Sequence, residues 1–181
     1  QGLDLPASPG AANKLAFFPG SSIGNFEPRE AETFLKDVGK HLRPNDAMLL
    51  GIDLKKDPAV LHAAYNDDAS VTARFNLNLL TRIKRELGSD LEPENFEHRA
   101  LYDESKGRVE MHLVSRRAQQ VSIAGQTFAF AEGESIHTEN SYKYTVAEFQ
   151  SLASRAGYSP ERVWTDADEY FSVHYLRFGR R

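Results

Sequence analysis

The first part of the chain contains two short apolar runs separated by a helical repeat. Residues 14–18 form one run, which stops at a Pro-Gly pair, and residues 47–53 form the other. Nearly continuous apolar runs of this length are typical of strands buried on both faces of a parallel sheet. After Pro28, apolar residues recur at helical spacing as far as Leu42. The pattern predicts a strand, a helix and a second, parallel strand.

The middle of the chain is first helical and then extended. Asp57-Pro58 predicts the start of one helix, and a longer helix is expected from Ser70 to a C-cap at Gly88. From Phe96 the apolar positions recur every second residue, and Gly125-Gln126 predicts a hairpin turn. The strands expected here cover residues 108–115, 120–124, 127–131 and 135–144.

The end of the chain returns to the first pattern. Thr145 and Glu148 form a capping box in sequence, which predicts a helix through Ala156, and strands follow over residues 162–165 and 170–178. A parallel sheet that finishes with helix, strand, strand resembles the end of a class I methyltransferase fold. We therefore expect an α/β fold, the carboxyl-terminal half of a Rossmann-like sheet with a helical and antiparallel insert. The expected domains are residues 1–56 and 145–181 for the sheet and 57–144 for the insert.

Composition excludes several classes of protein. The 181 residues include 22 Lys and Arg against 26 Asp and Glu, a balance that argues against nucleic-acid binding. There is no apolar run near the ~20 residues of a membrane span, and the first nine residues do not resemble a signal peptide. The absence of cysteine excludes thiol catalysis, disulfides and cysteine zinc sites and fits a cytoplasmic location. The six histidines show no His-x-x-x-His spacing, so no metal site is expected.

The first candidate site is the loop that follows the first predicted strand. In open α/β sheets, ligands bind at the carboxyl ends of the strands. Gly20 and Gly24 allow close approach of the backbone, and the Asn25 amide can both donate and accept hydrogen bonds. The alternative, favoured by spacing alone, is a glycine-rich turn with a capping asparagine at a helix start.

The second candidate site lies in the last strand of the insert. Glu139 and Ser141 are two residues apart, so a strand turns both side chains to the same face. A carboxylate beside a hydroxyl can bind a ring with two nitrogens. The alternative is a solvated edge strand, which is the commoner role for such a polar run.

The third candidate site lies on the two helices of the insert. Tyr65 falls on the first helix, and Phe75 falls on the second beside Asn76. From the residues alone, core packing is the default interpretation of both aromatic side chains.

Six segments together resemble one family, the histidine-specific, S-adenosylmethionine-dependent methyltransferases. These enzymes are the L-histidine Nα-methyltransferases of ergothioneine biosynthesis, and the resemblance runs from about Leu15 to Leu176. It implies trimethylation of the α-amino group of L-histidine to hercynine, with S-adenosylmethionine as co-substrate. The segments are residues 17–26, 65–67, 73–78, 85–88, 110–115 and 137–144.

The resemblance also implies a role for each candidate residue. Asn25 would hold the amino and carboxylate groups of the substrate, and Tyr65 would share that task. Glu139 and Ser141 would bind the two imidazole nitrogens. Two further pairs complete the implied site, with Phe75 and Met111 lining the pocket and Gly20 and Ser21 close to the cofactor.

One part of the family pattern is missing from this chain. The glycine-rich turn after the first strand of the family's sheet, and the acidic residue after the second, are not found here, so the chain resembles the carboxyl-terminal half. We expect this chain alone to be inactive, and residues 15–18 to form an unpaired edge that self-associates or is covered by residues 1–13. Two other functions remain open: a non-catalytic amino-acid-binding or assembly module, and a related methyltransferase acting on another aromatic amine.

Overall fold

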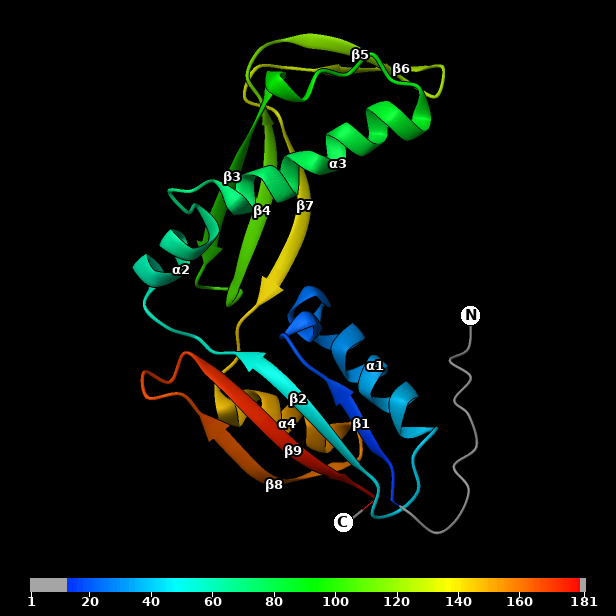
Figure 1. Ribbon diagram of the computed structural model, residues 1–181, viewed down its shortest axis with the longest axis vertical. Helices are drawn as coiled ribbons and strands as arrows, with labels where there is room; N and C mark the ends of the chain where they lie inside the picture. Colours follow the sequence, from blue (N-terminus) through cyan, green and yellow to red (C-terminus); the bar gives the residue numbers. More distant parts are fainter. Residues whose placement is uncertain (1–12, 180–181) are drawn as a thin grey trace. The chain divides into compact units, whose positions relative to one another are not determined.

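The computed structural model describes residues 13–179 and divides into two compact units (Figure 1). The first unit is formed by the chain up to Lys56 together with the segment from Ser141 onward. The second unit is Asp57–Asn140. Across residues 13–179, every helix is too short or too polar to cross a membrane.

The first unit is built on a four-stranded sheet. Its order is β1-β2-β9-β8, with β1 parallel to β2 and β9 antiparallel to both of its neighbours. The predicted strand-helix-strand start and the helix-strand-strand finish are therefore confirmed. The strands are β1 (Leu15–Phe18), β2 (Ala47–Asp53), β8 (Tyr158–Thr165) and β9 (Phe171–Phe178), so β8 begins earlier than the sequence pattern indicated.

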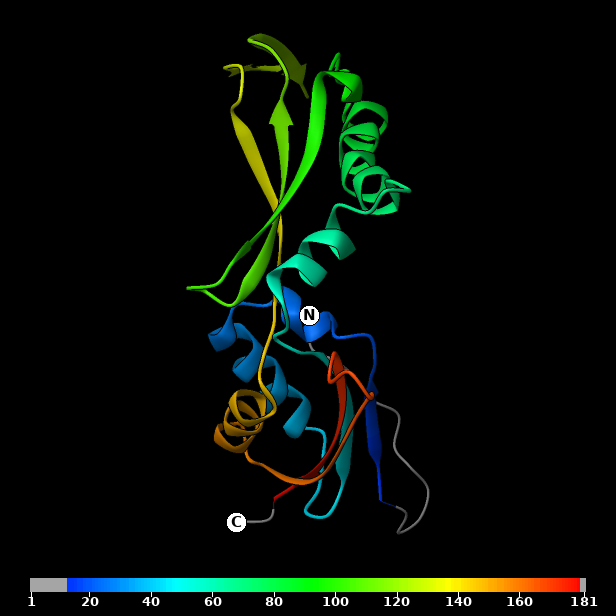
Figure 2. The ribbon, with the colours of Figure 1, turned by 90° about the vertical axis from the view of Figure 1, so that its left-hand side faces the viewer.

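Helices α1 (Pro28–Gly39) and α4 (Val146–Arg155) cover one face of this sheet (Figure 2). Leu35 and Phe149 from the helices are fully buried with Leu50 of β2 in one apolar cluster. Burial of such a side chain contributes roughly 1.5–3 kcal/mol. The predicted capping box of α4 is confirmed, since the Thr145 hydroxyl accepts from the Glu148 N–H and the Glu148 carboxylate accepts from the Thr145 N–H.

The prediction that residues 14–18 form a buried strand is wrong for the side chains of β1. Leu15 is 55% exposed and Phe17 is 67% exposed. The reason is that α1 and α4 lie on the opposite face, and no other helix of the described first unit covers these two residues. In the part of the chain that is described, β1 pairs only with β2. Residues 1–12, expected as a cover, lie outside the described residues.

The second unit contains two main helices, one 3-10 turn and two small sheets. Helices α2 (Pro58–Tyr65) and α3 (Val71–Leu87) pack against the sheet of order β3-β4-β7. Strands β5 and β6 form the predicted hairpin, but its turn is Ala124-Gly125, one residue before the expected Gly125-Gln126, because Gln126 already pairs with Ile123. Strand β7 begins in the second unit and ends in the first. The remaining elements are η2 (Pro93–Asn95), β3 (Phe96–Asp103), β4 (Arg108–Ser115), β5 (Gln119–Ile123), β6 (Gln126–Phe130) and β7 (Ser135–Tyr142).

The ends of α3 were only partly predictable. Gly88 caps the carboxyl end with a φ of 61°, as expected. At the other end Ser70 makes no side-chain capping bond. The carboxylate of Asp67 does so instead, accepting from the N–H groups of Val71 and Thr72 at 2.7 and 2.9 Å. These bonds, from Thr72 and then Val71, lower the pKa of Asp67 to about 2.

Candidate functional site

The loop after β1 turns at the carboxyl ends of two parallel strands. Gly20 and Ser21 have left-handed backbone angles, with φ of 78° and 57°, and the 3-10 helix η1 (Ser22–Asn25) follows. The Ser21 hydroxyl oxygen accepts a hydrogen bond of 2.8 Å from the backbone N–H of Asp53, the last residue of β2. Such backbone angles are unfavourable for a serine and persist where the surroundings hold them. Gly20 and Ser21 thus lie at the end of the sheet where α/β folds bind ligands.

Gly24 and Asn25, at the end of η1, differ in exposure. Gly24 is buried, and a Cβ atom there would lie 2.7 Å from the carbonyl oxygen of Tyr142, so the approach requires glycine. Asn25 is exposed. The alternative interpretation of Asn25 as a cap of α1 is wrong, because the N-cap is Glu27, whose N–H donates to the Glu30 carboxylate at 2.9 Å.

Ser141 is held by a buried lysine. The ammonium nitrogen Nζ of Lys143 lies 2.8 Å from Ser141 Oγ and 2.6 Å from Asp53 Oδ2. The Lys143 side chain is 1% exposed. Lys56 binds the other carboxylate oxygen of Asp53 at 2.5 Å. Because the Asp53 N–H binds Ser21, one residue links the loop after β1 to the strand that carries Ser141.

Sequence reasoning missed this link. Lys143 lies within the family-like segment 137–144 but received no role, and Asp53 was noted only as a strand end. The sequence did contain a signal: Lys143 stands between two aromatic residues, Tyr142 and Tyr144, at the end of a strand. A charged side chain in that position must have a partner, although the sequence does not identify which one.

In the second unit, Tyr65 and Met111 belong to the same apolar cluster. Met111 is 4% exposed and packs with Leu61, Ala100 and Val109, and Tyr65 packs against this cluster from the end of α2. The structure therefore brings together two of the residues for which the family resemblance implies a substrate role.

The backbone of Tyr65 is fixed by a polar network. Its carbonyl oxygen lies 2.9 Å from His98 Nε2, so that ring nitrogen is the donor. Nδ1 of the neutral ring then accepts from the Asn76 amide at 3.0 Å. The Asn76 amide oxygen accepts from the Thr138 hydroxyl at 2.8 Å. Asn76 is 1% exposed and joins α3 to the neighbouring strands.

Phe75 occupies a different environment from its neighbour Asn76. Its side chain is 66% exposed, and Val71 and Leu79, one turn before and after it on α3, are also exposed. The default interpretation of Phe75 as a core residue is therefore wrong. The helical repeat places these three residues on one stripe, but the buried stripe of α3 is the adjacent one, with Asn76 and Leu80.

Glu139 lies on β7, two residues before Ser141. Alternation along a strand turns the two side chains to the same face. Glu139 is partly exposed, and its carbonyl oxygen accepts from His137 Nε2 at 3.2 Å.

One cluster of metal-ligand residues was not expected from the sequence. Ligand atoms of Glu110 and His112 on β4 and of His137 on β7 all lie within 4.8 Å of one another. Burial raises the pKa of Glu110, but hydrogen bonds led by that from Arg108 outweigh it and lower the pKa to about 2. The two histidine rings stack at 4.6 Å and 18°, so their in-plane lone pairs do not converge. A carboxylate already bound to cations, beside stacked rings, is a poor metal site.

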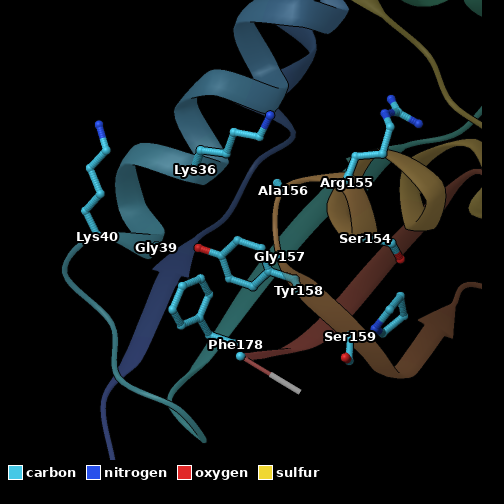
Figure 3. A pocket seen from close by; sticks show the side chains of 12 residues that line it. Lys36, Gly39, Lys40, Ser154, Arg155, Ala156, Gly157, Tyr158, Ser159 and Phe178 are labelled. Carbon is cyan, nitrogen blue, oxygen red and sulfur yellow. The ribbon is translucent and has the colours of Figure 1, made fainter. Parts of the chain in front are cut away.

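Figure 3 shows a cavity of the first unit, lined by residues of α1, α4, β8 and β9. It encloses ≈ 740 Å³, and Phe178 lines it from the end of β9. Because β9 runs antiparallel to β2, with Arg177 opposite Ala47, the cavity lies at the amino end of β2, opposite the ligand-binding end. Basic side chains at its rim already have carboxylate partners: Lys36 and Arg155 with Glu32, and Lys40 with Asp37.

Comparisons with known proteins identify relatives over most of the chain. The model of the family described as histidine-specific methyltransferase, SAM-dependent, matches residues 2–178. The chain is 39% identical over 160 residues to histidine N-alpha-methyltransferase from Mycolicibacterium smegmatis, covering 87% of this chain and 50% of that protein. The chain thus spans about half the length of this relative.

Two fungal relatives extend the comparison. Ergothioneine biosynthesis protein 1 from Neurospora crassa is 36% identical over 165 residues, which cover 89% of this chain and 18% of that protein. An L-tryptophan methyltransferase from Psilocybe serbica is 29% identical over 165 residues, which cover 88% and 46%.

Proposed function

The chain belongs to the histidine-specific, S-adenosylmethionine-dependent methyltransferase family, and we propose that the protein of which it forms a part methylates the α-amino group of L-histidine to hercynine. The names of the bacterial relative and of the ergothioneine biosynthesis protein support this substrate. In this proposal residues 57–144 are the substrate-binding insert, and residues 1–56 and 145–181 belong to the methyltransferase sheet. The absence of cysteine fits work in a reducing cytoplasm.

In the first unit, the loop after β1 would serve both substrates. Gly20 and Ser21 would approach S-adenosylmethionine, which supplies an electrophilic methyl group on a sulfonium when bound. The backbone suits such an approach, because a Cβ atom at Gly20 would meet no described atom within 4 Å. Asn25, exposed and not used as a helix cap, would hold the amino and carboxylate groups of histidine.

In the second unit, Tyr65 would also hold the amino-acid end of the substrate. Its place beside Met111, with a carbonyl fixed by His98, supports a rigid position for the phenol. Phe75 and Met111 would line the pocket. An aromatic side chain that is 66% exposed is consistent with a contact to a ligand or to another part of the protein.

Methyl transfer depends mainly on how the amine is positioned relative to the methyl donor. The neutral amine must hold its lone pair in line with the methyl carbon, so that the new C–N bond forms as the C–S bond breaks. The amine then loses a proton before the next methyl transfer. The site residues proposed here orient the amine and provide no covalent nucleophile.

The observation that carries the proposal is the pair Glu139 and Ser141 on β7. A carboxylate accepts a hydrogen bond from one imidazole nitrogen, and a hydroxyl held by Lys143 meets the other. An indole or phenyl ring would leave at least one of these groups without its hydrogen-bond partner and would therefore bind less tightly than imidazole.

A second candidate is methylation of another aromatic amine, such as tryptophan. The relative from Psilocybe serbica, named for L-tryptophan, supports this alternative. Two observations favour histidine. The identity to this relative is lower, 29% against 39% for the histidine enzyme, and the proposed pair Glu139 and Ser141 suits the two nitrogens of an imidazole. A non-catalytic binding module is the third function that the sequence left open.

Glu139→Ala in the full-length protein tests the assignment. Loss of a charge-assisted hydrogen bond costs about 1.5–3 kcal/mol, which predicts a rise of roughly 10- to 150-fold in the KM for histidine. Glu132→Ala is the matched control, because Glu132 is exposed on the connection before β7. Histidine kinetics within about twofold of the unmodified protein would contradict the imidazole assignment.

A further inference from the structure

His98 on β3 joins the end of α2 to α3 inside the second unit. Its ring nitrogen Nε2 lies 2.9 Å from the Tyr65 carbonyl oxygen, and Nδ1 lies 3.0 Å from the side-chain nitrogen of Asn76. Tyr65 is the last residue of α2, so its carbonyl has no partner within the helix. His98 therefore supplies the hydrogen bond that the helix cannot, at a residue to which the proposed function gives a substrate role.

The orientation of the Asn76 amide is fixed by its other contacts. Its nitrogen lies 3.2 Å from the backbone carbonyl oxygen of His112, which can only accept. Its oxygen accepts from the Thr138 hydroxyl at 2.8 Å. A reversed amide would place its oxygen against the His112 carbonyl. Because Asn76 is 1% exposed, water could not replace the lost hydrogen bond, so the observed orientation is strongly favoured.

This orientation selects one tautomer of the His98 ring. The Asn76 N–H points at Nδ1, so Nδ1 must carry the lone pair and Nε2 must carry the hydrogen. That hydrogen points at the Tyr65 carbonyl oxygen. The opposite tautomer would set two hydrogens against each other at Nδ1 and two lone pairs against each other at Nε2. The direction of one amide on α3 thus determines whether His98 can hold the end of α2.

A second link restrains the residue that follows Tyr65. The side chain of Asn66 donates to the Ala100 carbonyl oxygen and accepts from the Ala100 N–H, both at 3.1 Å. The last residue of α2 and the residue after it are therefore both bound to β3. Because the backbone is held at both residues, the direction in which the Tyr65 side chain leaves the helix is fixed. Its packing against the cluster that contains Met111 limits its rotamer.

We propose that His98 is a positioning residue for methyl transfer, held by Asn76 in the tautomer that binds the Tyr65 carbonyl and so keeps the Tyr65 phenol at the amino-acid end of the substrate. The inference rests on the proposed function, which gives Tyr65 that role. His98 acts through Tyr65 and makes no contact with the substrate itself. Its contribution should therefore appear in the binding of histidine and should depend on the Tyr65 hydroxyl.

The test compares the steady-state kinetics of the full-length protein with those of its variants His98→Leu and His98→Gln. His98→Leu removes the bond to the Tyr65 carbonyl. The KM for histidine should then rise roughly 3- to 10-fold, as expected for one weakened hydrogen bond to the substrate, with a smaller change in kcat. His98→Gln should stay within about twofold of the unmodified protein, because its amide can accept from Asn76 and donate to Tyr65.

Two controls separate this role from a general loss of stability. Ser89→Ala removes another buried polar group of the second unit, a hydroxyl whose oxygen accepts from the Leu91 N–H at 3.1 Å. It should lower the melting temperature and leave the KM for histidine unchanged. In a Tyr65→Phe background, His98→Leu should change the KM by less than about twofold, because the hydroxyl that His98 positions is already absent.

NMR of the unmodified protein with isotope-labelled histidine gives an independent measurement if His98→Leu does not fold. At mildly alkaline pH the His98 ring should be the neutral tautomer with its hydrogen on Nε2. A ring with its hydrogen on Nδ1 would overturn the inference, since that tautomer cannot donate to the Tyr65 carbonyl.

The outcomes distinguish this inference from the proposed function. Absence of histidine methylation by the unmodified protein would overturn both. Methylation of histidine with a KM that His98→Leu leaves unchanged, or with effects of His98→Leu and Tyr65→Phe that simply add, would overturn the role of His98 and leave the function standing. A rise in the KM that is seen in His98→Leu, is absent in His98→Gln and disappears in the Tyr65→Phe background supports the inference.

Discussion

The backbone N–H of Asp53 donates to the hydroxyl of Ser21 at 2.8 Å and so joins the end of β2 to the loop after β1. The same residue binds Lys143 through its carboxylate. The two groups of residues in the first unit that the proposed function requires, the loop and the end of β7, therefore share one anchor. Disturbing this anchor should affect methyl transfer even where no substrate contact is removed.

Ser21→Ala removes the acceptor for the Asp53 N–H and leaves the left-handed backbone of residue 21 without the bond that helps to hold it. We expect a loss of about 1 kcal/mol in stability and a clear fall in kcat for histidine methylation. Ser22→Ala is the control, since Ser22 is the exposed neighbour within η1. Thermal melting and steady-state kinetics measure the two effects, and equal behaviour of the two variants would contradict the anchor.

Gly24→Ala should be harmful because of contact rather than backbone angle. The added Cβ would lie 2.7 Å from the Tyr142 carbonyl oxygen, a backbone atom that cannot rotate away. Overpacking of this kind costs typically 1–3 kcal/mol. The expected outcome is a lower melting temperature together with weaker histidine binding, measured by calorimetry. An unchanged melting temperature would show that the loop does not approach β7 this closely.

Asp67→Ala should destabilise the start of α3 by leaving the Val71 and Thr72 N–H groups without their acceptor. The melting temperature should fall by several degrees, whereas Asp68→Ala, at the exposed neighbouring carboxylate, should change it little. The Asp67 pKa is lowered to about 2, so its contribution is present above the usual carboxylate range and is lost as the pH falls toward 2. Equal melting of the two variants would assign the cap elsewhere.

Because His174 is buried, we expect the free energy of unfolding to decrease on acidification. The side chain is fully buried, and burial lowers its pKa from 6.5 to about 4. Between these values the unfolded chain binds a proton that the folded chain does not, so stability is lost as the pH falls from 6.5 to 4, by about 3 kcal/mol. In His174→Gln this part of the slope should vanish. Parallel melting curves for both proteins between pH 7 and pH 4 would contradict a buried neutral imidazole.

The order of helices and strands could be predicted because it depends on local patterns. The alternation in residues 108–115 predicted β4, and the Thr145–Glu148 pattern and Gly88 predicted two helix ends, all now observed. Local patterns could not predict which face of a helix or strand is buried by other parts of the protein. Periodicity shows that Val71 and Phe75 share a face, but burial depends on what packs there, and both are exposed.

The polar contacts of the candidate site were beyond sequence reasoning for a related reason. Lys143 and Asp53 are 90 residues apart in the chain, and the isolated bridge between their neighbours Leu54 and Tyr144 brings them together. Glu110 and His137 are likewise brought together by neighbouring strands. The side chain that caps the start of α3 is that of Asp67 and not that of Ser70, because Ser70 takes a left-handed backbone angle with a φ of 56° that an N-cap does not normally have.

The most direct test of the central claim is the product formed by the full-length protein from L-histidine and S-adenosylmethionine. Mass spectrometry with fragmentation gives the number of methyl groups and the nitrogen that carries them. The account predicts histidine trimethylated on the α-nitrogen with an unmodified ring, and faster turnover of histidine than of tryptophan at equal concentrations. Methyl groups on the imidazole, a preference for tryptophan, or no transfer to either amino acid would contradict it.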